Sequence, residues 1–390
     1  MRNFDFVSPT YFAFGRESEE RTGQLCRQFG AGKVLVHYGQ GSVVKSGLLA
    51  KVRASLEAAE LPYVELGGVV PNPHLSLVYE GIEICRREGV DFVLAVGAGS
   101  AIDSAKAIAM GAVNSEDIWR IIEEGLPIEA ALPLATVLTL PATGSESSAS
   151  TVISNTVTKQ KYGYGSDLIR PVFAVMNPEL TFTLPPFQTA CGVMDMMSHL
   201  FERYLSPTPN VDFTDRLIEG ALQSIIHNTK IVMREPVNYA ARANLMWAGT
   251  IAHNNVLGVG RQQDWSSHAI EHELSALHDV AHGAGLAVVF PAFMRYTLDA
   301  DVARYAQLAH RVWGIPIDFS NLRRTAIEGI EALEHFIERE LQLPLKLEAL
   351  GASPEDIDYV AEHCRMRGEK LGSFSPLSRD DIRELLKLAL

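Results

Sequence analysis

Four side chains of the types that bind divalent metal ions stand out in the chain. They are Asp195, His199, His268 and His282. Asp195 and His199 are four residues apart, so on a helix they lie one above the other on the same face and can bind one ion together. One carboxylate with three imidazoles is a donor set that suits zinc or ferrous iron. The sequence therefore predicts a site for one divalent metal ion.

The segment that carries the second pair of histidines must change direction. His268 and His282 are separated by fourteen residues, which is roughly 21 Å along an unbroken helix at about 1.5 Å per residue. Because that length exceeds the reach of one ion, we expect a turn around residues 278–282. Gly283 and Gly285 can adopt turn conformations that other residues avoid, so we expect them to form it.

An exposed helix face, a metalloprotease site and a structural zinc site fit this histidine cluster less well. Four of the twelve histidines lie within residues 268–282, more than one exposed helix face would require. His272 and Glu273 begin the H-E-x-x-H signature of metalloproteases, but the closing position is Ala276, which disfavours that class. A structural zinc site would more often use cysteine. The four cysteines are scattered without a C-x-x-C pair, so we expect buried free thiols: Cys26, Cys85, Cys191 and Cys364.

Length and composition limit the class of protein. A chain of 390 residues with 47% hydrophobic content can form two cores, so we expect two domains. The net charge of -13 disfavours nucleic acid and anionic membranes as partners and leaves a small molecule as the expected substrate. The first residues lack the apolar core of a signal peptide, and no apolar run approaches the roughly 18 residues of a membrane span. With unpaired cysteines as well, we expect a cytoplasmic protein.

The order of apolar patterns predicts an α/β domain followed by a helical one. Up to about residue 184, apolar β-type runs alternate with helical stretches, which is typical of a parallel sheet covered by helices. Residues 156–169 are mostly polar and are expected to form a loop between two strands. From residue 185 onward the period is helical, with helices expected at 211–231, 236–256 and 320–341.

A glycine turn in the first domain is a candidate phosphate site. Residues 90–96 predict a buried strand, which Gly97 and Gly99 end, and Ser100 can cap the helix that follows. The free N–H groups and positive dipole end of such a helix favour a phosphate. Ile102 stands where the usual dinucleotide fingerprint needs a third glycine, so a purely structural turn accounts for the pattern equally well.

A second polar turn follows the strand expected at residues 133–138. Thr139, Thr143, Gly144 and Ser145 could contact phosphate or ribose, although turns of this composition often only cap helices. A Walker A loop is absent from the sequence, which disfavours ATP chemistry.

Taken together, these motifs resemble those of the iron-containing, or group III, alcohol dehydrogenases. The resemblance runs nearly end to end, in the family's order and spacing. It rests on PNP at 71–73, GAGSAIDSAK at 97–106, TLPATGSESS at 139–148, D-x-x-x-H at 195–199, and the H-x-x-x-H and HG around 268–283. The chain looks most similar to the family's butanol dehydrogenase and NADPH-dependent aldehyde reductase branch.

This resemblance implies a fold, a metal site and a reaction. The fold is a Rossmann-like parallel sheet in a dinucleotide-binding domain at 1–184 and an all-helical metal-binding and substrate domain at 185–390, with cofactor and metal in the cleft between them. The implied metal ligands are the four residues named first, and the ion is Fe²⁺ or Zn²⁺. His272 matches the histidine that the family places beside the substrate for proton relay; a structural role is the alternative.

The resemblance also implies a set of cofactor residues. They are Gly39, Gln40, Gly41, Ser42, Asn72, Gly97, Ala98, Gly99, Ser100, Asp103, Thr139, Thr143, Ser148 and Lys161. NAD-specific sites commonly place a carboxylate against the ribose 2′-hydroxyl at the end of the first strand. Gly39 occupies that position here, so we expect NADP(H) to be preferred over NAD(H).

Three positions depart from the family's pattern. Ala98 replaces a glycine, a change that is tolerable if its φ is negative. Ser148 replaces a frequent asparagine, and Asn177 replaces a usual aspartate. None of the three alters a proposed metal ligand.

The activity expected from the resemblance is that of a metal-dependent, NAD(P)(H)-linked alcohol dehydrogenase or aldehyde reductase. Its substrates would be primary alcohols, butanol-like in size, and the corresponding aldehydes, and the enzyme would be a homodimer. Two alternatives remain: a polyol dehydrogenase of the same superfamily, and a metal-binding protein of this fold without catalysis.

Overall fold

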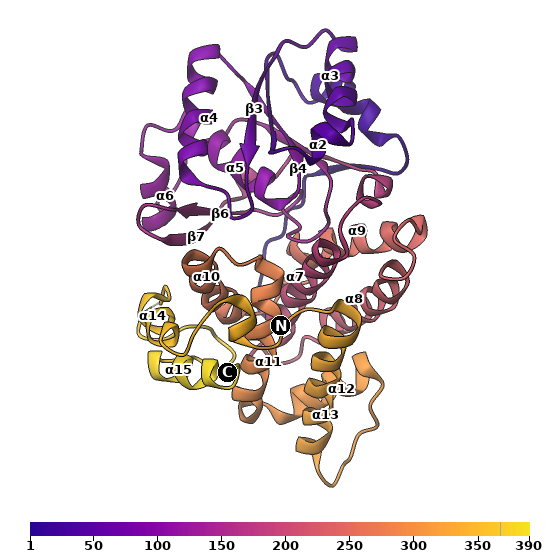
Figure 1. Ribbon diagram of the computed structural model, residues 1–390, viewed down its shortest axis with the longest axis vertical. Helices are drawn as coiled ribbons and strands as arrows, with labels where there is room; N and C mark the ends of the chain where they lie inside the picture. The colour runs from indigo at the N-terminus through magenta and orange to yellow at the C-terminus, as the bar shows by residue number, and fades with distance from the viewer. Residues whose placement is uncertain (367) are drawn as a thin grey trace. The chain divides into compact units, whose positions relative to one another are not determined.

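The computed structural model describes residues 1–366 and 368–390, which form two compact units. One unit is Val7–Leu184, and the other is Pro185–Leu390 together with Met1–Phe6. The first contains a parallel sheet with helices and the second is helical (Figure 1). The fold class predicted from the sequence is therefore confirmed.

A six-stranded sheet forms the centre of the first unit, and every pairing in it is parallel. The strand order is β1 (Tyr11–Phe14), β8 (Phe173–Met176), β5 (Leu134–Leu138), β4 (Phe92–Gly97), β2 (Val34–Gly39) and β3 (Tyr63–Val69). The central strands β4 and β5 are continuous apolar runs, because helices cover both of their faces. The helices are α1 (Thr22–Gln28), α2 (Ser42–Lys45), α3 (Leu48–Ala58), α4 (Leu75–Glu88), α5 (Gly99–Val113) and α6 (Ile118–Glu124).

The side chains of β2 show how the two faces of the sheet are covered. Val34 and Val36 share a core with helices α1 and α3. His37 points to the opposite face, where its Nε2 lies 2.8 Å from Ser104 Oγ of α5. Figure 1 shows α4 and α5 on one side of the sheet and α2 and α3 on the other. This alternation is the period-two pattern of a strand buried on both faces.

Two expectations about this unit were wrong. The polar segment expected as a loop contains strand β7 (Gln160–Gly165), which pairs antiparallel with β6 (Ser150–Asn155). Its alternating tyrosines account for this: the Tyr162 ring stacks on Trp119 at 5.6 Å, and Tyr164 OH donates to a backbone carbonyl. The single helix expected from residue 44 to 59 is divided into α2 and α3, because Gly47 adopts a left-handed φ of 78°.

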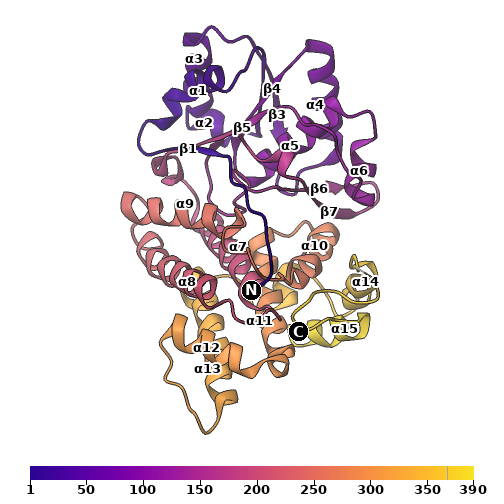
Figure 2. The ribbon, with the colours of Figure 1, turned by 180° about the vertical axis from the view of Figure 1, so that it is seen from behind.

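The second unit is built around two long helices, α7 (Pro186–Tyr204) and α11 (His282–Tyr296). Nearly every residue of α11 is buried, as expected for a helix that is apolar on all sides. Around these helices pack α8 (Asp212–Val232), α9 (Tyr239–His253), α10 (Ser266–His278), α12 (Val302–Trp313), α13 (Leu322–His335), α14 (Asp356–His363) and α15 (Arg379–Lys387). In Figure 2, α8 and α9 lie on one side of α7 and α11, and α14 and α15 lie on the other.

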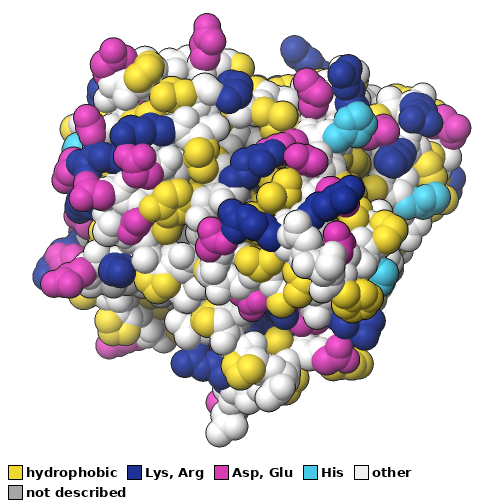
Figure 3. Space-filling model, turned by 90° about the horizontal axis from the view of Figure 1, so that it is seen from below, with side chains coloured by type: hydrophobic (Ala, Val, Ile, Leu, Met, Phe, Trp, Pro, Cys, Tyr) yellow, Lys and Arg dark blue, Asp and Glu magenta, His cyan; other side chains and the backbone are white. Residues whose placement is uncertain are grey.

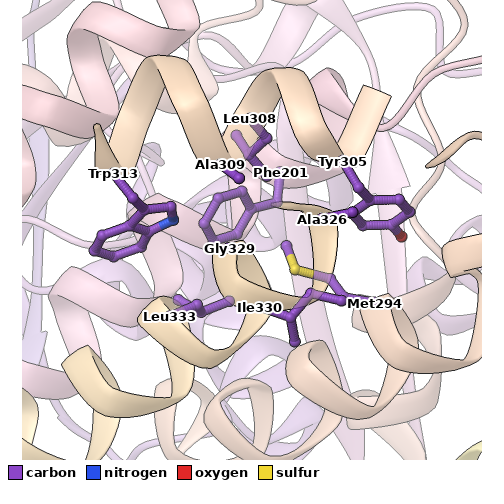
Figure 4. Close-up of a pocket in the computed structure, with 10 residues that line it drawn as sticks. All are labelled: Phe201, Met294, Tyr305, Leu308, Ala309, Trp313, Ala326, Gly329, Ile330 and Leu333. Atoms are coloured by element: carbon purple, nitrogen blue, oxygen red, sulfur yellow. The ribbon is translucent and has the colours of Figure 1, made fainter. Parts of the chain in front are cut away.

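The core between α12 and α13 is closely packed. Figure 4 shows ten side chains from α7, α11, α12 and α13 around a cavity of about 10 Å³, roughly the space of one water molecule. Gly329 allows the close approach of the two helices, since a Cβ there would lie 2.5 Å from Ala309 Cβ. This cavity is too small for an organic substrate.

The first residues of the chain belong to the helical unit. The backbone N–H of Arg2 donates to the Gly260 carbonyl at 2.7 Å, and its guanidinium donates to Gln262 at 2.9 Å. The chain therefore passes between the two units twice, once near residue 7 and once near residue 185.

Charges of both signs are interspersed on the face seen in Figure 3, with apolar side chains between them. A search of the described helices finds none that combines the length and the apolar character required to cross a membrane.

Candidate metal and cofactor sites

Helix α7 positions the first two candidate ligands. Asp195 is 3% exposed and His199 is 4% exposed, and both lie on one face of the helix, as their spacing predicted. His199 Nε2 is 3.5 Å from Asp195 Oδ1.

Helices α10 and α11 position the other two. His268 lies in the first turn of α10, and His282 is the first residue of α11. The chain turns between them, as expected, but glycine does not form the turn. Asp279 adopts the left-handed conformation with a φ of 52°, as its short polar side chain permits.

Gly283 and Gly285 instead lie inside α11, where they allow close helix packing. A Cβ at Gly283 would lie 2.1 Å from the Cys191 carbonyl oxygen of α7, and one at Gly285 would lie 2.7 Å from Glu271 Cγ of α10. These two glycines therefore bring α11 close to both helices that carry the other candidate ligands.

One carboxylate oxygen lies at the centre of the cluster. Asp195 Oδ1 is 3.5 Å from His199 Nε2, 3.9 Å from His268 Nε2 and 3.6 Å from His282 Nε2. The ligand atoms of Asp195, His268 and His282 all lie within 4.8 Å of one another, and His199 approaches this group through the shared oxygen. Two donor atoms that each lie about 2.1 Å from one ion at a tetrahedral angle are roughly 3.4 Å apart, so the spacing fits one metal ion.

The hydrogen-bonding state of these atoms also fits a cation. Among the described residues, Asp195 Oδ1 and His268 Nε2 are buried without a hydrogen-bond partner. A buried polar atom without a partner costs free energy, so such atoms in a native protein indicate a missing bonding group. Three nitrogens and one anionic oxygen around a single point are the donor set expected for zinc or iron.

Two buried glutamates hold the outer nitrogens of the histidines. His268 Nδ1 lies 3.0 Å from Glu202 Oε1, and His282 Nδ1 contacts Glu271 Oε2. Each carboxylate therefore favours a proton on Nδ1 and leaves Nε2, which faces Asp195, free to bind a cation. A carboxylate behind a histidine in this way also makes the imidazole a better metal ligand.

The charges at the cluster shift the histidines in opposite directions. Burial lowers the pKa of His268, but its interactions with the carboxylates of Asp195 and Glu202 outweigh burial and raise the pKa to about 9. Burial, followed by the charges of His253 and His268, places the pKa of His199 well below its ordinary value. A bound cation would replace the proton on His268, so metal binding would release protons.

The remaining histidines of the segment have different surroundings. His272, half-buried, lies with its ring 5.6 Å from that of His282, and it forms a second group of possible donors with Glu271. His278 instead pairs with Asp356 at 3.1 Å and lies outside both groups.

Sequence reasoning missed several residues around the cluster. Glu202 follows Asp195 by seven residues, a spacing that returns to the same helix face and could have indicated it. Glu271 follows His268 by three residues, so the same spacing rule applies to it. His253 and Trp265 carried no such signal, because they reach the cluster from a helix end and a loop: the His253 ring lies 4.0 Å from that of His199.

In the first unit, the two predicted turns meet at the carboxyl ends of β4 and β5. Thr139 N donates to the Gly97 carbonyl at 3.1 Å. A Cβ at Gly99 would lie 2.5 Å from the Thr143 side chain, so this position requires glycine. Ala98 has a φ of -89°, which confirms that alanine is tolerated there.

Asp103 holds the second turn against helix α5. Its carboxylate accepts hydrogen bonds from Ser145 Oγ at 2.6 Å and Val152 N at 3.1 Å. These bonds give Asp103 a structural role within the unit. Lys161 is buried on strand β7, where it pairs with Ser154 of β6.

Lys106, one helical turn beyond Asp103, holds the other end of the same turn. Its fully buried ammonium donates to the Ser148 carbonyl at 2.9 Å, to Ser148 Oγ at 3.2 Å and to the Ser150 carbonyl at 2.8 Å. Burial lowers the pKa of Lys106 to about 7, against the opposing charges of Asp103 and Glu146. Ser148, expected at the cofactor, thus binds a lysine of its own unit.

The remaining predicted cofactor residues lie in exposed or half-buried turns. Gly39 ends strand β2, and Gly41 precedes the short helix α2, which Ser42 begins and which follows the exposed Gln40. Asn72 adopts the left-handed conformation with a φ of 54°. A Cβ added at Gly39 would have the Val69 carbonyl oxygen, at 3.6 Å, as its nearest neighbour.

Comparison with known proteins decides the family. The "Iron-containing alcohol dehydrogenase" family matches residues 9–178, and the "Fe-containing alcohol dehydrogenase family, C-terminal" matches residues 189–390. The chain belongs to the iron-containing alcohol dehydrogenase family. The resemblance seen in the sequence is therefore confirmed.

Curated relatives of this family cover the whole chain. The chain is 40% identical to the probable NADH-dependent butanol dehydrogenase 1 of Bacillus subtilis, with all of both proteins covered. It is 37% identical to the NADPH-dependent aldehyde reductase YqhD of Escherichia coli, again with both covered in full. Among solved structures, NADH-dependent butanol dehydrogenase A of Thermotoga maritima is 40% identical, with a TM-score of 0.95 over 100% of this chain and 99% of that one.

One departure from the family's sequence pattern has a direct structural cause. Asn177 Nδ2 donates to the buried Glu19 Oε2 at 2.9 Å, while Lys51 pairs with Glu19 Oε1 at 2.8 Å. An aspartate at position 177 would place a second carboxylate against Glu19. Asparagine is therefore matched to the glutamate that it contacts.

Proposed function

We propose that this member of the iron-containing alcohol dehydrogenase family interconverts simple primary alcohols and aldehydes with a divalent metal ion and NAD(P)(H). The observation that carries this proposal is the convergence of three imidazole Nε2 atoms on one oxygen of Asp195. The names of its relatives support the reaction, since they are butanol dehydrogenases and an aldehyde reductase.

The residues of the second unit have distinct roles in this proposal. Asp195, His199, His268 and His282 hold the ion, and Glu202 fixes the His268 ring through Nδ1. Three histidines and one carboxylate leave room for a substrate oxygen among the donors. When bound, the metal polarises a carbonyl as a Lewis acid, and the nicotinamide exchanges hydride with its carbon.

His272 is proposed to exchange the proton with the substrate oxygen. It lies one turn beyond His268 on the same face of α10, and its ring is 5.6 Å from that of His282. General acid catalysis of this kind typically contributes about 10² to 10⁴ in rate. His272→Ala should retain metal and cofactor but lose turnover; unchanged turnover across pH would return this residue to a structural role.

The cofactor is proposed to bind at the turns that follow β2, β4 and β5. Gly97, Gly99 and Thr143 offer close approach to the backbone at the first turn of α5, whose N–H groups favour a phosphate. Relatives are named for both cofactors, with NADH-dependent names at 40% identity and an NADPH-dependent name at 37%. We propose a preference for NADPH, because residues 39–42 contain no carboxylate to repel a 2′-phosphate.

The identity of the metal is proposed to be ferrous iron or zinc. Ferrous iron is oxidised in air, whereas zinc has no redox chemistry. Protein prepared with iron should therefore lose activity aerobically and regain it with anaerobic Fe²⁺. Full activity in air at full zinc occupancy would assign zinc as the working ion.

A homodimer is proposed because the sheet has an edge that invites pairing. Strand β1 lies at the edge and carries the exposed aromatic side chains of Tyr11 and Phe14. Exposed strand edges readily pair with another chain. Light scattering at micromolar concentration tests this, and a monomeric mass there would contradict it.

The function is tested with a panel of substrates on protein of measured metal content, followed by nicotinamide absorbance. Turnover should be highest with simple aldehydes and primary alcohols. Highest turnover with glycerol or related polyols would favour the polyol dehydrogenase alternative. The 1,3-propanediol dehydrogenase of Citrobacter freundii is a more distant relative, 28% identical. Bound metal and dinucleotide without any turnover would indicate a binding protein.

Replacement of one histidine tests the metal site itself. His282→Ala should remove metal and activity together while the helical content is retained. Full metal content and turnover in this variant would disprove the proposed site.

A further inference from the structure

Trp265, which directly precedes helix α10, has an unusual backbone. Its φ of 70° and ψ of 11° place it in the left-handed region, which bulky residues rarely adopt. Such a conformation persists only where the surroundings fix it, and it is concentrated at functional sites. Here the Trp265 N–H donates to Glu202 Oε2 at 2.8 Å.

The same carboxylate also holds a proposed metal ligand. The other oxygen of Glu202 accepts a hydrogen bond from the His268 backbone N–H at 3.1 Å and faces His268 Nδ1 at 3.0 Å. Glu202 is fully buried, so neither bond is exchanged for water. The backbone of Trp265 and the ring of His268 are thus fixed by one side chain.

The partly exposed indole ring of Trp265 fills the space between four other side chains. The guanidinium of Arg203 lies over the ring at 4.8 Å from its centroid. Its ring centroid lies 5.1 Å from that of His268, 5.4 Å from that of His253 and 5.9 Å from that of His199, with interplanar angles of 58° to 69°. These are edge-to-face geometries of favourable aromatic contacts.

The orientation of His199 depends on such packing. Within the described part of the chain, its Nδ1 has no hydrogen-bond partner. The outer nitrogens of His268 and His282 are held by carboxylates, but the ring of His199 is held by its neighbours His253, His268 and Trp265.

We propose that Trp265 is a positioning residue that orients the imidazoles of His199 and His268 for metal binding. This inference rests on the proposed metal site. It assigns the ring, rather than the backbone conformation alone, as the determinant of metal affinity. Loss of groups that orient a ligand typically weakens metal binding by about 10- to 100-fold.

Two substitutions separate the ring from the backbone. Trp265→Asn removes the ring but suits the left-handed conformation, which asparagine adopts more readily than most residues, and it keeps the N–H that binds Glu202. Trp265→Phe keeps an aromatic ring. Trp247→Asn, on α9 and with a side chain 42% exposed, is the control for loss of a tryptophan elsewhere in the unit.

The experiment titrates metal-free protein with Co²⁺ in competition with a chelator and records the visible Co²⁺ spectrum. Trp265→Asn should bind Co²⁺ about 10- to 100-fold more weakly and with an altered spectrum. Trp265→Phe should stay within about threefold of the wild type, and Trp247→Asn should match it. An affinity of Trp265→Asn within twofold of the wild type, with an unchanged spectrum, would overturn the inference. Failure of the wild type to bind Co²⁺ would instead reject the proposed metal site.

Fluorescence provides a second measurement if Trp265→Asn does not fold. Because its ring lies 5.1 and 5.9 Å from two proposed ligands, Trp265 should account for most of the emission quenched by Co²⁺. Trp265→Phe should lose that quenching, whereas Trp247→Phe should retain it. Equal quenching in Trp265→Phe and the wild type would contradict the proposed geometry.

Discussion

Glu202 faces His268 Nδ1 at 3.0 Å with one carboxylate oxygen and accepts the backbone N–H of Trp265 at 2.8 Å with the other. Glu202 follows His199 on α7, so one helix supplies two proposed ligands and the group that orients a third. The position of His268 is therefore determined by α7 as well as by its own helix α10.

The first prediction concerns Glu202→Gln. A carboxylate accepts hydrogen bonds at both oxygens, but glutamine has only one acceptor oxygen, so its NH₂ must face either His268 Nδ1 or the Trp265 N–H. We expect Zn²⁺ affinity at pH 7 to fall by about 10- to 100-fold, measured by chelator competition. Glu384→Gln, exposed on α15, is the control. Wild-type affinity in Glu202→Gln would show that this bond does not orient the ligand.

The second prediction compares two glycine-to-alanine substitutions. Gly283→Ala places a Cβ 2.1 Å from the Cys191 carbonyl oxygen, which is backbone and must move with α7. We expect a loss of about 1–3 kcal/mol in stability, and weaker metal binding because Asp195 is one turn beyond Cys191. Gly220→Ala, on exposed α8 with nothing within 4 Å, should instead stabilise by about 0.5–1 kcal/mol. Equal melting temperatures of the two variants would refute this view of the packing.

The third prediction concerns acid stability. Burial lowers the pKa of His37 to about 4, against 6.5 for a free histidine. His37 Nδ1 lies 2.9 Å from the Leu66 carbonyl, so it donates there and Nε2 accepts from Ser104. Because the folded pKa lies below the unfolded pKa, this stabilisation is complete above about pH 6.5 and is lost as the pH falls towards 4, a change of about 3 kcal/mol.

Acid unfolding followed by circular dichroism measures this effect. His37→Asn should be less stable than the wild type at pH 7 but should lose less stability between pH 6.5 and 4. His227→Asn, at an exposed position on α8, should follow the wild-type curve. Parallel curves for His37→Asn and the wild type would exclude His37 as the cause.

The fourth prediction tests the match between Asn177 and Glu19. Asn177→Asp turns a hydrogen bond into a contact of two carboxylates at a position where Glu19 is 1% exposed. We expect a loss of about 1–3 kcal/mol near neutral pH. Adding Glu19→Gln should recover part of it, since the amide can donate to the new aspartate, and a double-mutant cycle measures the coupling. Additive effects of the two substitutions would contradict a direct interaction.

The sequence predicted those features that depend on local spacing. The four-residue interval of Asp195 and His199 requires only a helix, and α7 provides it. The alternation of strands and helices before residue 184 likewise predicted the parallel sheet, because both patterns reflect burial along one element.

Features that depend on contacts between distant segments were not predictable in this way. Gly283 was expected in a turn, but its small size serves the approach of α11 to α7, which no local pattern records. Strand β7 was missed because its glycines conceal the alternation of Tyr162 and Tyr164. Glu271 contacts the ring of His282 only after α10 and α11 have packed together.

The last prediction concerns the choice of dinucleotide, which rests on the proposed cofactor site. If the 2′-phosphate lies at the end of β2, a carboxylate introduced there should repel it. Gly39→Asp can be accommodated, because the added Cβ would meet only the Val69 carbonyl oxygen, at 3.6 Å. A carboxylate about 4 Å from a phosphate is repelled by about 4 kcal/mol per pair of unit charges at an effective dielectric near 20. Solvent screening reduces this at an exposed turn.

Steady-state kinetics with both cofactors measure the effect, and Gly39→Asn is the control of equal size without the charge. The wild type should show higher kcat/KM with NADPH than with NADH. Gly39→Asp should lose at least roughly tenfold in kcat/KM with NADPH, which requires only about 1.4 kcal/mol, while NADH is affected much less. Gly39→Asn should lose little with either cofactor, because the cause is charge rather than size. Equal losses with NADPH and NADH, or a wild type that prefers NADH, would show that the 2′-phosphate does not lie at Gly39.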